Sequence, residues 1–227
     1  MTELSRSPQM IEDARLVDVI AFDWDMTVVD SHGKLLQNFA IAAEFGNPLT
    51  IDEVRWHWNE SIGFPDLMAR LTNGADMGKI MEVVKRDYNK HEFAKRAFDY
   101  AAPAITKLRE AGYKTAIVSG VQRELLEKDA HDLGIDLDAL FDFIQAQDDC
   151  EHKKPDGRVF NPLLRHFAIT ADRLLYIGDE MKDMRAVIDA GGHFLGVETG
   201  MSTGAEFEAV GALHVPTLKE VQVYGTV

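Results

Sequence analysis

Two apolar runs stand out along the chain, and a helical pattern lies just before the second. Residues 16–22 (LVDVIAF) and residues 114–118 (KTAIV) are nearly continuous stretches of apolar, often β-branched side chains. Such runs are typical of strands that are covered on both faces in a parallel sheet. Residues 103–111 place apolar side chains on one helical face and are followed by Gly112, a common helix stop. The pattern therefore predicts a helix that leads into a second buried strand.

The rest of the chain repeats this alternation. Helical spacing ends at a glycine twice, at Gly134 and at Gly191. The predicted helices cover residues 121–133, 156–167 and 181–190, and the predicted strands cover residues 141–146, 174–177 and 193–197. Strand–helix units joined by right-handed crossovers form a doubly wound parallel sheet, so we predict an α/β fold of that class.

Residues 32–98 interrupt the alternation, because they carry helical patterns and no convincing strand. The first pattern predicts one buried face made of Leu35, Leu36, Phe39, Ala40 and Ala43. A later pattern predicts another made of Met77, Ile80, Met81, Val84 and Tyr88. Trp56 and Trp58 are expected in the same apolar core. We therefore predict a core domain of residues 1–31 and 99–227, with an all-helical domain of residues 32–98 inserted after the first strand.

Composition narrows the functional classes. The 227 residues carry 38 acidic and 24 basic side chains, for a formal net charge of −14. A field of this sign repels nucleic acid and anionic membranes, so we expect neither as a partner. Cys150 is the single cysteine, which rules out an intramolecular disulfide and fits a reducing compartment. With no apolar run long enough for a membrane helix and no basic-then-apolar start, we expect a cytoplasmic protein.

Polar residues that follow the predicted strands are the candidates for chemistry, because ligands of open α/β sheets bind beyond the carboxyl ends of the strands. They form four groups along the chain: Asp23, Asp25 and Thr27; Ser119 and Gly120; Lys153 and Lys154; and Gly178, Asp179, Glu180 and Asp183. Acids gathered in one crevice repel one another unless a cation lies among them, and oxygen ligands favour Mg²⁺. A hydroxyl and a lysine nearby suit a phosphate group. Asp23 is then a candidate nucleophile and Asp25 a candidate proton shuttle.

The order of these groups is specific. Asp23-Trp24-Asp25-Met26-Thr27, then Ser119, then Lys154-Pro155, then Gly178-Asp179-Glu180 with Asp183 resembles the four motifs of the haloacid dehalogenase superfamily of phosphohydrolases. The likeness extends from residue 16 to about residue 198. It implies a Rossmann-like catalytic core.

The resemblance also implies a role for each residue. Asp23 would attack phosphorus to form an aspartyl-phosphate, and Asp25 would protonate the leaving oxygen and later activate water. Mg²⁺ would be held by Asp23, the backbone carbonyl of Asp25 and Asp179, with help from Asp183. The phosphate-binding residues would be Thr27, Ser119, Gly120 and Lys154. True dehalogenases lack the second carboxylate, so Asp25 favours phosphoryl transfer.

The helical segment resembles the cap of the phosphoglycolate phosphatase-like and β-phosphoglucomutase-like subfamily. Ile62, Gly63 and Phe64 would then form the cap's specificity loop, and Arg70, Lys79 and Lys85 are possible contacts for a second anionic group. Two positions depart from the commonest family pattern. Met26 replaces a glycine, which would narrow the floor of the pocket, and Glu180 replaces a small polar residue, which would add charge near the metal.

These observations predict a Mg²⁺-dependent phosphatase that hydrolyses a small phosphomonoester, similar to phosphoglycolate or a sugar phosphate. Two alternatives remain open. A phosphomutase of the β-phosphoglucomutase type could use the same core motifs. A non-catalytic module that binds Mg²⁺ or phosphate, similar to a receiver domain, would have its motifs in another order and a shorter chain. The substrate itself and the oligomeric state do not follow from the sequence.

Overall fold

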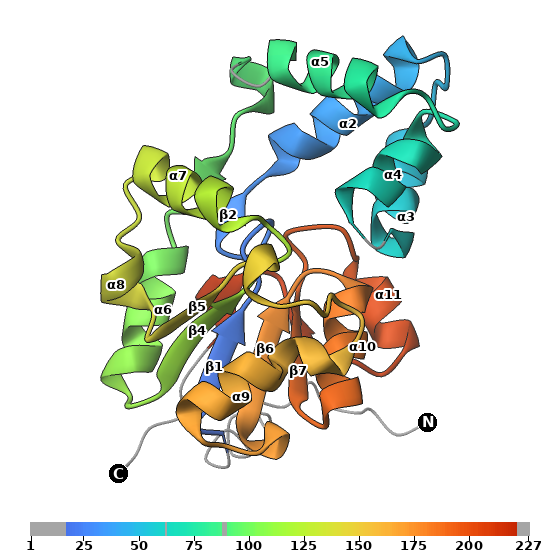
Figure 1. The fold of residues 1–227 in the computed structure, drawn as a ribbon. Coiled ribbons are helices and arrows are strands. Elements are labelled where there is room, and N and C mark those ends of the chain that lie inside the picture. Colours follow the sequence, from blue (N-terminus) through green and yellow to red (C-terminus); the bar gives the residue numbers. More distant parts are fainter. Residues whose placement is uncertain (1–16, 62, 88–89, 222–227) are drawn as a thin grey trace.

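A computed structural model describes residues 17–61, 63–87 and 90–221 of the chain. Its main sheet is six-stranded and parallel, with the strand order β5-β4-β1-β6-β7-β8 (Figure 1). The strands are β1 (Val19–Phe22), β4 (Lys114–Val118), β5 (Phe143–Gln145), β6 (Leu174–Gly178), β7 (His193–Val197) and β8 (His214–Val215). The predicted α/β class and parallel sheet are confirmed. β1 lies between β4 and β6, so the residues that follow it face the middle of the sheet edge.

Helices cover both faces of this sheet, as a doubly wound fold requires. Ile20 and Phe22 of β1 pack into one apolar cluster, and Val19 and Ala21 pack into another on the opposite face. The first face is covered by α6 (Ala101–Glu110), α7 (Arg123–Leu133) and α8 (Leu137–Leu140), and the second by α9 (Asn161–Phe167), α10 (Met181–Ala190) and α11 (Gly204–Ala209). Burial on both faces explains why the strand sequences are continuously apolar.

Local signals set most helix ends where the sequence places them. Gly134 and Gly191 end α7 and α10 in the left-handed conformation, with φ of 67° and 89°. Pro162 lies in the first turn of α9, where it removes no helical hydrogen bond. The short elements α8, α11 and β8 carry too few residues for a periodic pattern and were not anticipated. Within the described residues, the 3₁₀ helices are η2 (His91–Phe93), η3 (Gln147–Asp149), η4 (Gly157–Phe160), η5 (Ala171–Arg173) and η6 (Leu218–Glu220).

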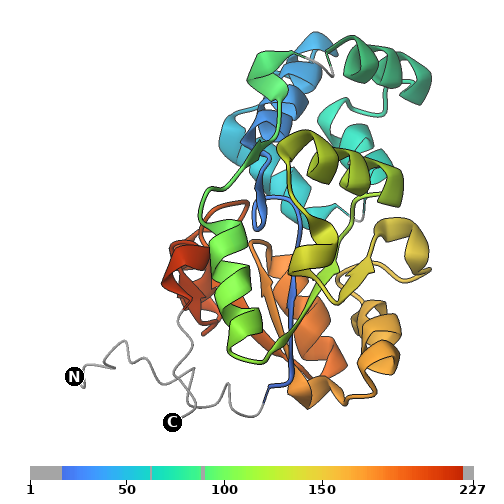
Figure 2. The same ribbon diagram turned by 90° about the vertical axis from the view of Figure 1, so that its left-hand side faces the viewer.

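The helical insertion, defined as α2 to η2, follows the first strand as predicted. It contains α2 (His32–Glu44), α3 (Ile51–Glu60), α4 (Phe64–Leu71) and α5 (Met77–Asp87), and it sits beyond the carboxyl end of the sheet (Figures 1 and 2). The chain enters it through β2 (Val29–Asp30) and leaves it through β3 (Arg96–Ala97), and these strands pair antiparallel. The expectation of no strand within residues 32–98 is therefore wrong at β3, a two-residue strand that is too short to produce a pattern.

The insertion has its own apolar core, but two sequence-based assignments to that core were wrong. On α2, Leu36 and Phe39 are 46% and 37% exposed and Ala43 is exposed as well, whereas Gln37 and Asn38 are buried. The helix turns a partly polar face inward because that face borders a cavity rather than apolar packing alone. Trp56 is also exposed, at 58%. Tyr88 lies outside the described residues.

Among residues 17–61, 63–87 and 90–221, no helix has the length and apolar content that crossing a membrane requires.

Candidate active site

The carboxyl ends of the central strands bring the predicted site residues together. Asp23 follows β1, Ser119 follows β4 and Asp179 follows β6. Phe22 pairs with Ile117 on one side and Ile177 on the other, so the three strands end at about the same level. The residues that come next along each strand therefore face one crevice, as the rule for open sheets predicts.

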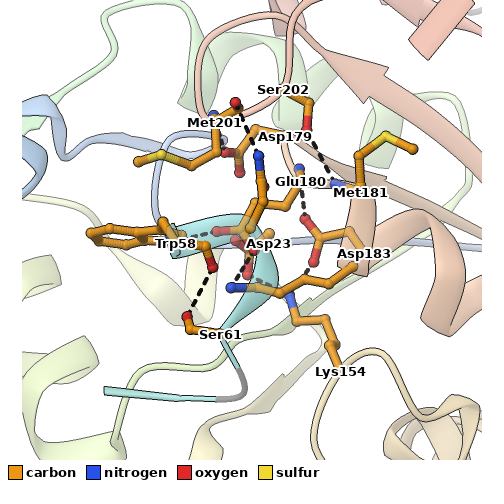
Figure 3. A network of polar contacts seen from close by, with 12 residues as sticks. Asp23, Trp58, Ser61, Lys154, Asp179, Glu180, Met181, Asp183, Met201 and Ser202 are labelled. Atoms are coloured by element: carbon orange, nitrogen blue, oxygen red, sulfur yellow. Dashed lines mark hydrogen bonds and ion pairs between the residues drawn. The ribbon is translucent and has the colours of Figure 1, made fainter. Parts of the chain in front are cut away.

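Three carboxylates form a buried cluster in this crevice. Asp23, Asp179 and Asp183 each offer an oxygen, and these oxygens lie within 4.8 Å of one another. Asp179 and Asp183 both come from the segment that starts α10, and Asp23 faces them from β1 (Figure 3). Hard oxygen donors at this spacing fit a divalent cation.

Lys154 supplies the positive charge within the cluster. Its Nζ donates to Asp23 Oδ1 at 2.9 Å, to Asp183 Oδ1 at 2.6 Å and to the Tyr176 hydroxyl at 2.8 Å. The Tyr176 hydroxyl donates in turn to the carbonyl of Val118 at 2.6 Å, so a residue of β6 is anchored to the end of β4. Lys154, rather than its exposed neighbour Lys153, is therefore the lysine in contact with the acids.

One ammonium group does not compensate for three buried carboxylates. Burial raises the pKa of Asp23 to about 6, with the nearby Asp183 charge adding to the rise and Lys154 opposing it. Burial also raises the pKa of Asp179 well above its ordinary value, and the charges of Glu180 and Asp183 act in the same direction. The pKa of Asp183 is raised mainly by burial as well. A bound divalent cation would relieve this repulsion, so the donor set fits a metal in charge as well as in geometry.

Two hydrogen bonds orient the Asp179 carboxylate. Thr27 Oγ1 donates to Oδ1 at 3.3 Å, and the Met201 backbone N–H donates to Oδ2 at 2.9 Å. Thr27 is fully buried and is not among the described residues that line the cavity. Its predicted role as a phosphate ligand stays a prediction, and its observed contact favours a role in holding Asp179.

Asp25 points to a different set of charges from Asp23. Lys95 Nζ lies 2.6 Å from Asp25 Oδ1 and 2.6 Å from Asp129 Oδ2, so it bridges the turn after β1 to α7. Burial opposes the charge on Lys95, but the two carboxylates outweigh it and raise the pKa of the ammonium group. Sequence reasoning missed both Lys95 and Asp129, and no motif marks them. The pairing of β2 with β3 is what returns residue 95 to the first motif.

A cavity of about 600 Å³ opens between the sheet edge and the helical insertion. The sheet side contributes Asp23, Asp25, Ser119, Gly120 and Lys154, and the insertion contributes Lys34, Gln37, Asn38, Trp58, Gly63 and Phe64. Two residues of the predicted specificity loop therefore line it, and Ile62 lies outside the described residues. None of Arg70, Lys79 and Lys85 is among the described lining residues, and Arg70 instead pairs with Asp66 within the insertion. The cations from this side are Lys34 and Lys95 instead.

Ser119 and Gly120 lie where a phosphate group would need them. Both line the cavity, and Ser119 Oγ accepts the Val121 N–H at 3.1 Å, which leaves the hydroxyl hydrogen available for another partner. Their phosphate-binding role stays a prediction.

The two departures from the family pattern have visible consequences. Met26 adopts a φ of 60°, the left-handed conformation that favours glycine, and its buried side chain packs in the core of the insertion. It is not among the described residues that line the cavity, so the expected narrowing of the pocket floor is not found. Glu180 stands beside the three-carboxylate cluster, accepts a hydrogen bond from Trp58 Nε1 at 2.6 Å and pairs with Lys182 at 2.6 Å.

Comparison with known proteins identifies the class. The family model of haloacid dehalogenase-like hydrolases matches residues 20–197, and the chain belongs to that family. The match spans all four motifs and the insertion. This match and the phosphatase names of the relatives make the chain an enzyme of the phosphatase type.

The individual relatives and solved structures share only about a quarter of their residues, or fewer, with this chain. Pyrophosphatase PpaX of Halalkalibacterium halodurans is 26% identical over 191 residues, which cover 82% of this chain and 83% of the relative. A structure of a haloacid dehalogenase-like hydrolase from Bacteroides fragilis is similar, with a TM-score of 0.72 and 25% identity over 90% of this chain and 99% of that one. A predicted phosphoglycolate phosphatase from Haemophilus somnus has the same fold, with a TM-score of 0.71 and 18% identity over 90% of this chain and 96% of that one.

Proposed function

We propose that this enzyme hydrolyses a small phosphomonoester through an aspartyl-phosphate on Asp23, with Mg²⁺ as its cofactor. The observation that carries the proposal is the buried cluster of Asp23, Asp179 and Asp183 with Lys154, at the edge of a cavity large enough for a small metabolite. Mg²⁺ would be held by these three carboxylates and by the backbone carbonyl of Asp25. When bound, it would neutralise charge on the phosphoryl oxygens.

The chain's own residues divide the chemistry into two steps. In the first, a carboxylate oxygen of Asp23 forms a bond to phosphorus while the bond to the leaving oxygen breaks, and Asp25 gives that oxygen its proton. In the second, Asp25 takes a proton from water, the water oxygen bonds to phosphorus and the bond to Asp23 breaks. Lys154, Ser119 and the Gly120 amide hold the phosphoryl group in both steps.

The insertion acts as the cap in this proposal, with the domain division at residues 1–31 and 99–227 against 32–98. Trp58, Gly63 and Phe64 face the same cavity as the nucleophile, so they can contact the part of the substrate that leaves. Closing that cavity keeps bulk water away from the aspartyl-phosphate until hydrolysis is due.

A phosphoanhydride such as pyrophosphate is the second candidate substrate. Lys34 and Lys95 lie at the cavity near Asp25, on the side where the leaving group would sit. Burial and the neighbouring Lys95 lower the pKa of Lys34, so an anionic leaving group beside it would stabilise the charged ammonium group. The relative from Halalkalibacterium halodurans is named as a pyrophosphatase, which favours including this class.

The test is a phosphate-release screen with sugar phosphates, phosphoglycolate, nucleotides and pyrophosphate, run with Mg²⁺ and again with a chelator. We expect Mg²⁺-dependent release that chelation abolishes. Phosphorus NMR of the products separates the mutase alternative, because a sugar phosphate converted to its isomer without free phosphate would contradict hydrolysis. Binding of Mg²⁺ and phosphate with no turnover on any substrate would favour a non-catalytic module.

We place the enzyme in the cytoplasm as part of the same proposal. The lone Cys150 is a free thiol, as expected for a protein kept in a reducing compartment.

A further inference from the structure

Helix α3 of the insertion contacts the two short segments that flank the Asp179 carboxylate (Figure 3). Arg55 Nη2 donates to the Met201 carbonyl at 2.7 Å, and Asn59 Nδ2 donates to the same oxygen at 3.3 Å. One turn along, Trp58 Nε1 donates to Glu180 Oε1 at 2.6 Å. All three bonds join the insertion to the core close to Asp179. Glu180 is the next residue along the chain, and Met201 is itself hydrogen-bonded to the Asp179 carboxylate.

Met201 touches both parts of the molecule. Its backbone N–H donates to Asp179 Oδ2, whereas its side chain, only 1% exposed, packs in the apolar core of the insertion with Met26. Its carbonyl accepts the two bonds from α3. A shift of the insertion therefore pulls on the same residue that orients the carboxylate.

The loop around Met201 has little freedom to absorb such a shift. Ser202 N–H donates to the Asp179 carbonyl at 3.0 Å, and Ser202 Oγ accepts the Met181 N–H at 3.1 Å. Gly200 is packed so closely that a Cβ there would lie 2.0 Å from Asp179 Oδ2 and 2.6 Å from Met26 Cβ. Movement of this loop must move the carboxylate with it.

We propose that Met201, held by Arg55 and Asn59, is a positioning residue through which docking of the helical insertion aligns Asp179 for the divalent cation. This rests on the proposed metal site. Docking and cation binding are then thermodynamically linked, so each strengthens the other by the same factor. The insertion thus prepares the metal site as well as covering the substrate.

The direct test is the double variant Arg55→Ala/Asn59→Ala, which removes both donors and leaves every predicted metal ligand in place. Mg²⁺ alone is titrated, and its dissociation constant is read from tryptophan fluorescence, since Trp24 adjoins Asp23. We expect Mg²⁺ to bind about tenfold more weakly, within the usual range of such couplings. Arg70→Ala is the matched control, because Arg70 pairs with Asp66 inside the insertion. It should bind Mg²⁺ as the wild type does.

The reciprocal effect gives a readout that needs no turnover. Hydrogen exchange in α3 should slow when Mg²⁺ is added to the wild type, and this protection should disappear in Asp179→Asn. If the double variant fails to fold, Trp58→Phe keeps an aromatic side chain, loses the N–H donor to Glu180 and should show a smaller shift in the same direction.

The outcomes separate the two proposals. Wild-type Mg²⁺ affinity in the folded double variant overturns the coupling and leaves the proposed phosphatase function intact. Absence of Mg²⁺ binding to the wild-type enzyme overturns the metal site, and with it both proposals.

Discussion

Two groups of charges share the crevice, and they are assembled differently. The first, Asp23, Asp179, Asp183 and Lys154, comes wholly from the core and follows the ends of strands or begins helices. The second, Asp25, Lys95 and Asp129, joins a turn after β1, the end of the insertion and the helix α7. Motifs mark the first group and Asp25 in the sequence, and only the folded chain reveals Lys95 and Asp129 as the partners of Asp25.

The difference teaches what each group can control. The first group holds the cation and the phosphoryl group with core residues alone, and the insertion adjusts it indirectly, through its hydrogen bonds to Met201 and Glu180. The second includes a lysine from the segment through which the chain leaves the insertion, so the proton shuttle depends on how the two parts are joined. Variants in each group should therefore fail in different ways.

The largest effect is expected from Asp23→Asn. Losing the nucleophile should lower Mg²⁺-dependent phosphate release from an aryl phosphate by about 10³-fold or more. Circular dichroism should be unchanged. Asp18→Asn is the matched control, because Asp18 lies just before β1 at its opposite end and pairs with Arg173. Wild-type turnover in Asp23→Asn would remove Asp23 from the role of nucleophile.

Asp25→Asn should come next, with a loss that depends on the leaving group. General acid catalysis contributes roughly 10²–10⁴-fold, so we expect a decrease of that size with a sugar phosphate. An aryl phosphate leaves without much need of a proton, so it should lose less in the first step. Comparing single-turnover rates for the two substrates checks this. Equal losses for both would contradict a proton transfer to the leaving oxygen.

Lys95→Met should have a mixed effect on stability and turnover. It leaves Asp25 and Asp129 without their shared cation, which should lower the free energy of unfolding by roughly 1–3 kcal/mol, less than for a fully buried pair. Turnover should fall by about tenfold if Asp25 loses its orientation, which is well below the loss in Asp25→Asn. Denaturant unfolding and steady-state kinetics measure the two separately. Lys90→Met, which removes an exposed partner of Asp87, should change neither by more than a small amount.

Thr27→Val should give the smallest effect and decides between two roles of one residue. If the hydroxyl holds Asp179, Mg²⁺ affinity should fall by a few-fold, about the effect of one hydrogen bond, with KM for substrate little changed. A rise in KM at saturating Mg²⁺ would instead support the phosphate-binding role. Thr72→Val is the control, because the buried Thr72 hydroxyl bonds Met68 within the insertion.

The sheet and its crevice could be predicted because both follow from local patterns. Continuous apolar runs mark buried parallel strands, and the ends of such strands meet at one edge whatever the connections between them. Asp23, Ser119 and Asp179 could therefore be grouped without any knowledge of side-chain contacts.

The insertion was harder to predict because its helices do not pack against a sheet. Periodicity assigned Leu36 and Phe39 to the buried face of α2. In the structure the buried face borders the cavity and carries Gln37 and Asn38 instead. Trp58 packs against the apolar core of the insertion as expected, but its indole N–H also bonds Glu180 across the two parts, which no pattern predicted. Contacts such as this one and Lys95 with Asp25 depend on tertiary geometry, which a pattern of hydrophobic residues does not encode.

The pairing of β2 with β3 has a consequence for how such enzymes diversify. Val29 lies opposite Ala97, so the chain leaves the core and returns to it at neighbouring points. A segment with adjacent ends can be replaced by another of different length without rethreading the sheet. The exchange is constrained at two places, since Met26 and Met201 of the core fit this particular set of helices. A new insertion would have to pack on the same two methionines or on their replacements, so the insertion and these core residues are expected to evolve together.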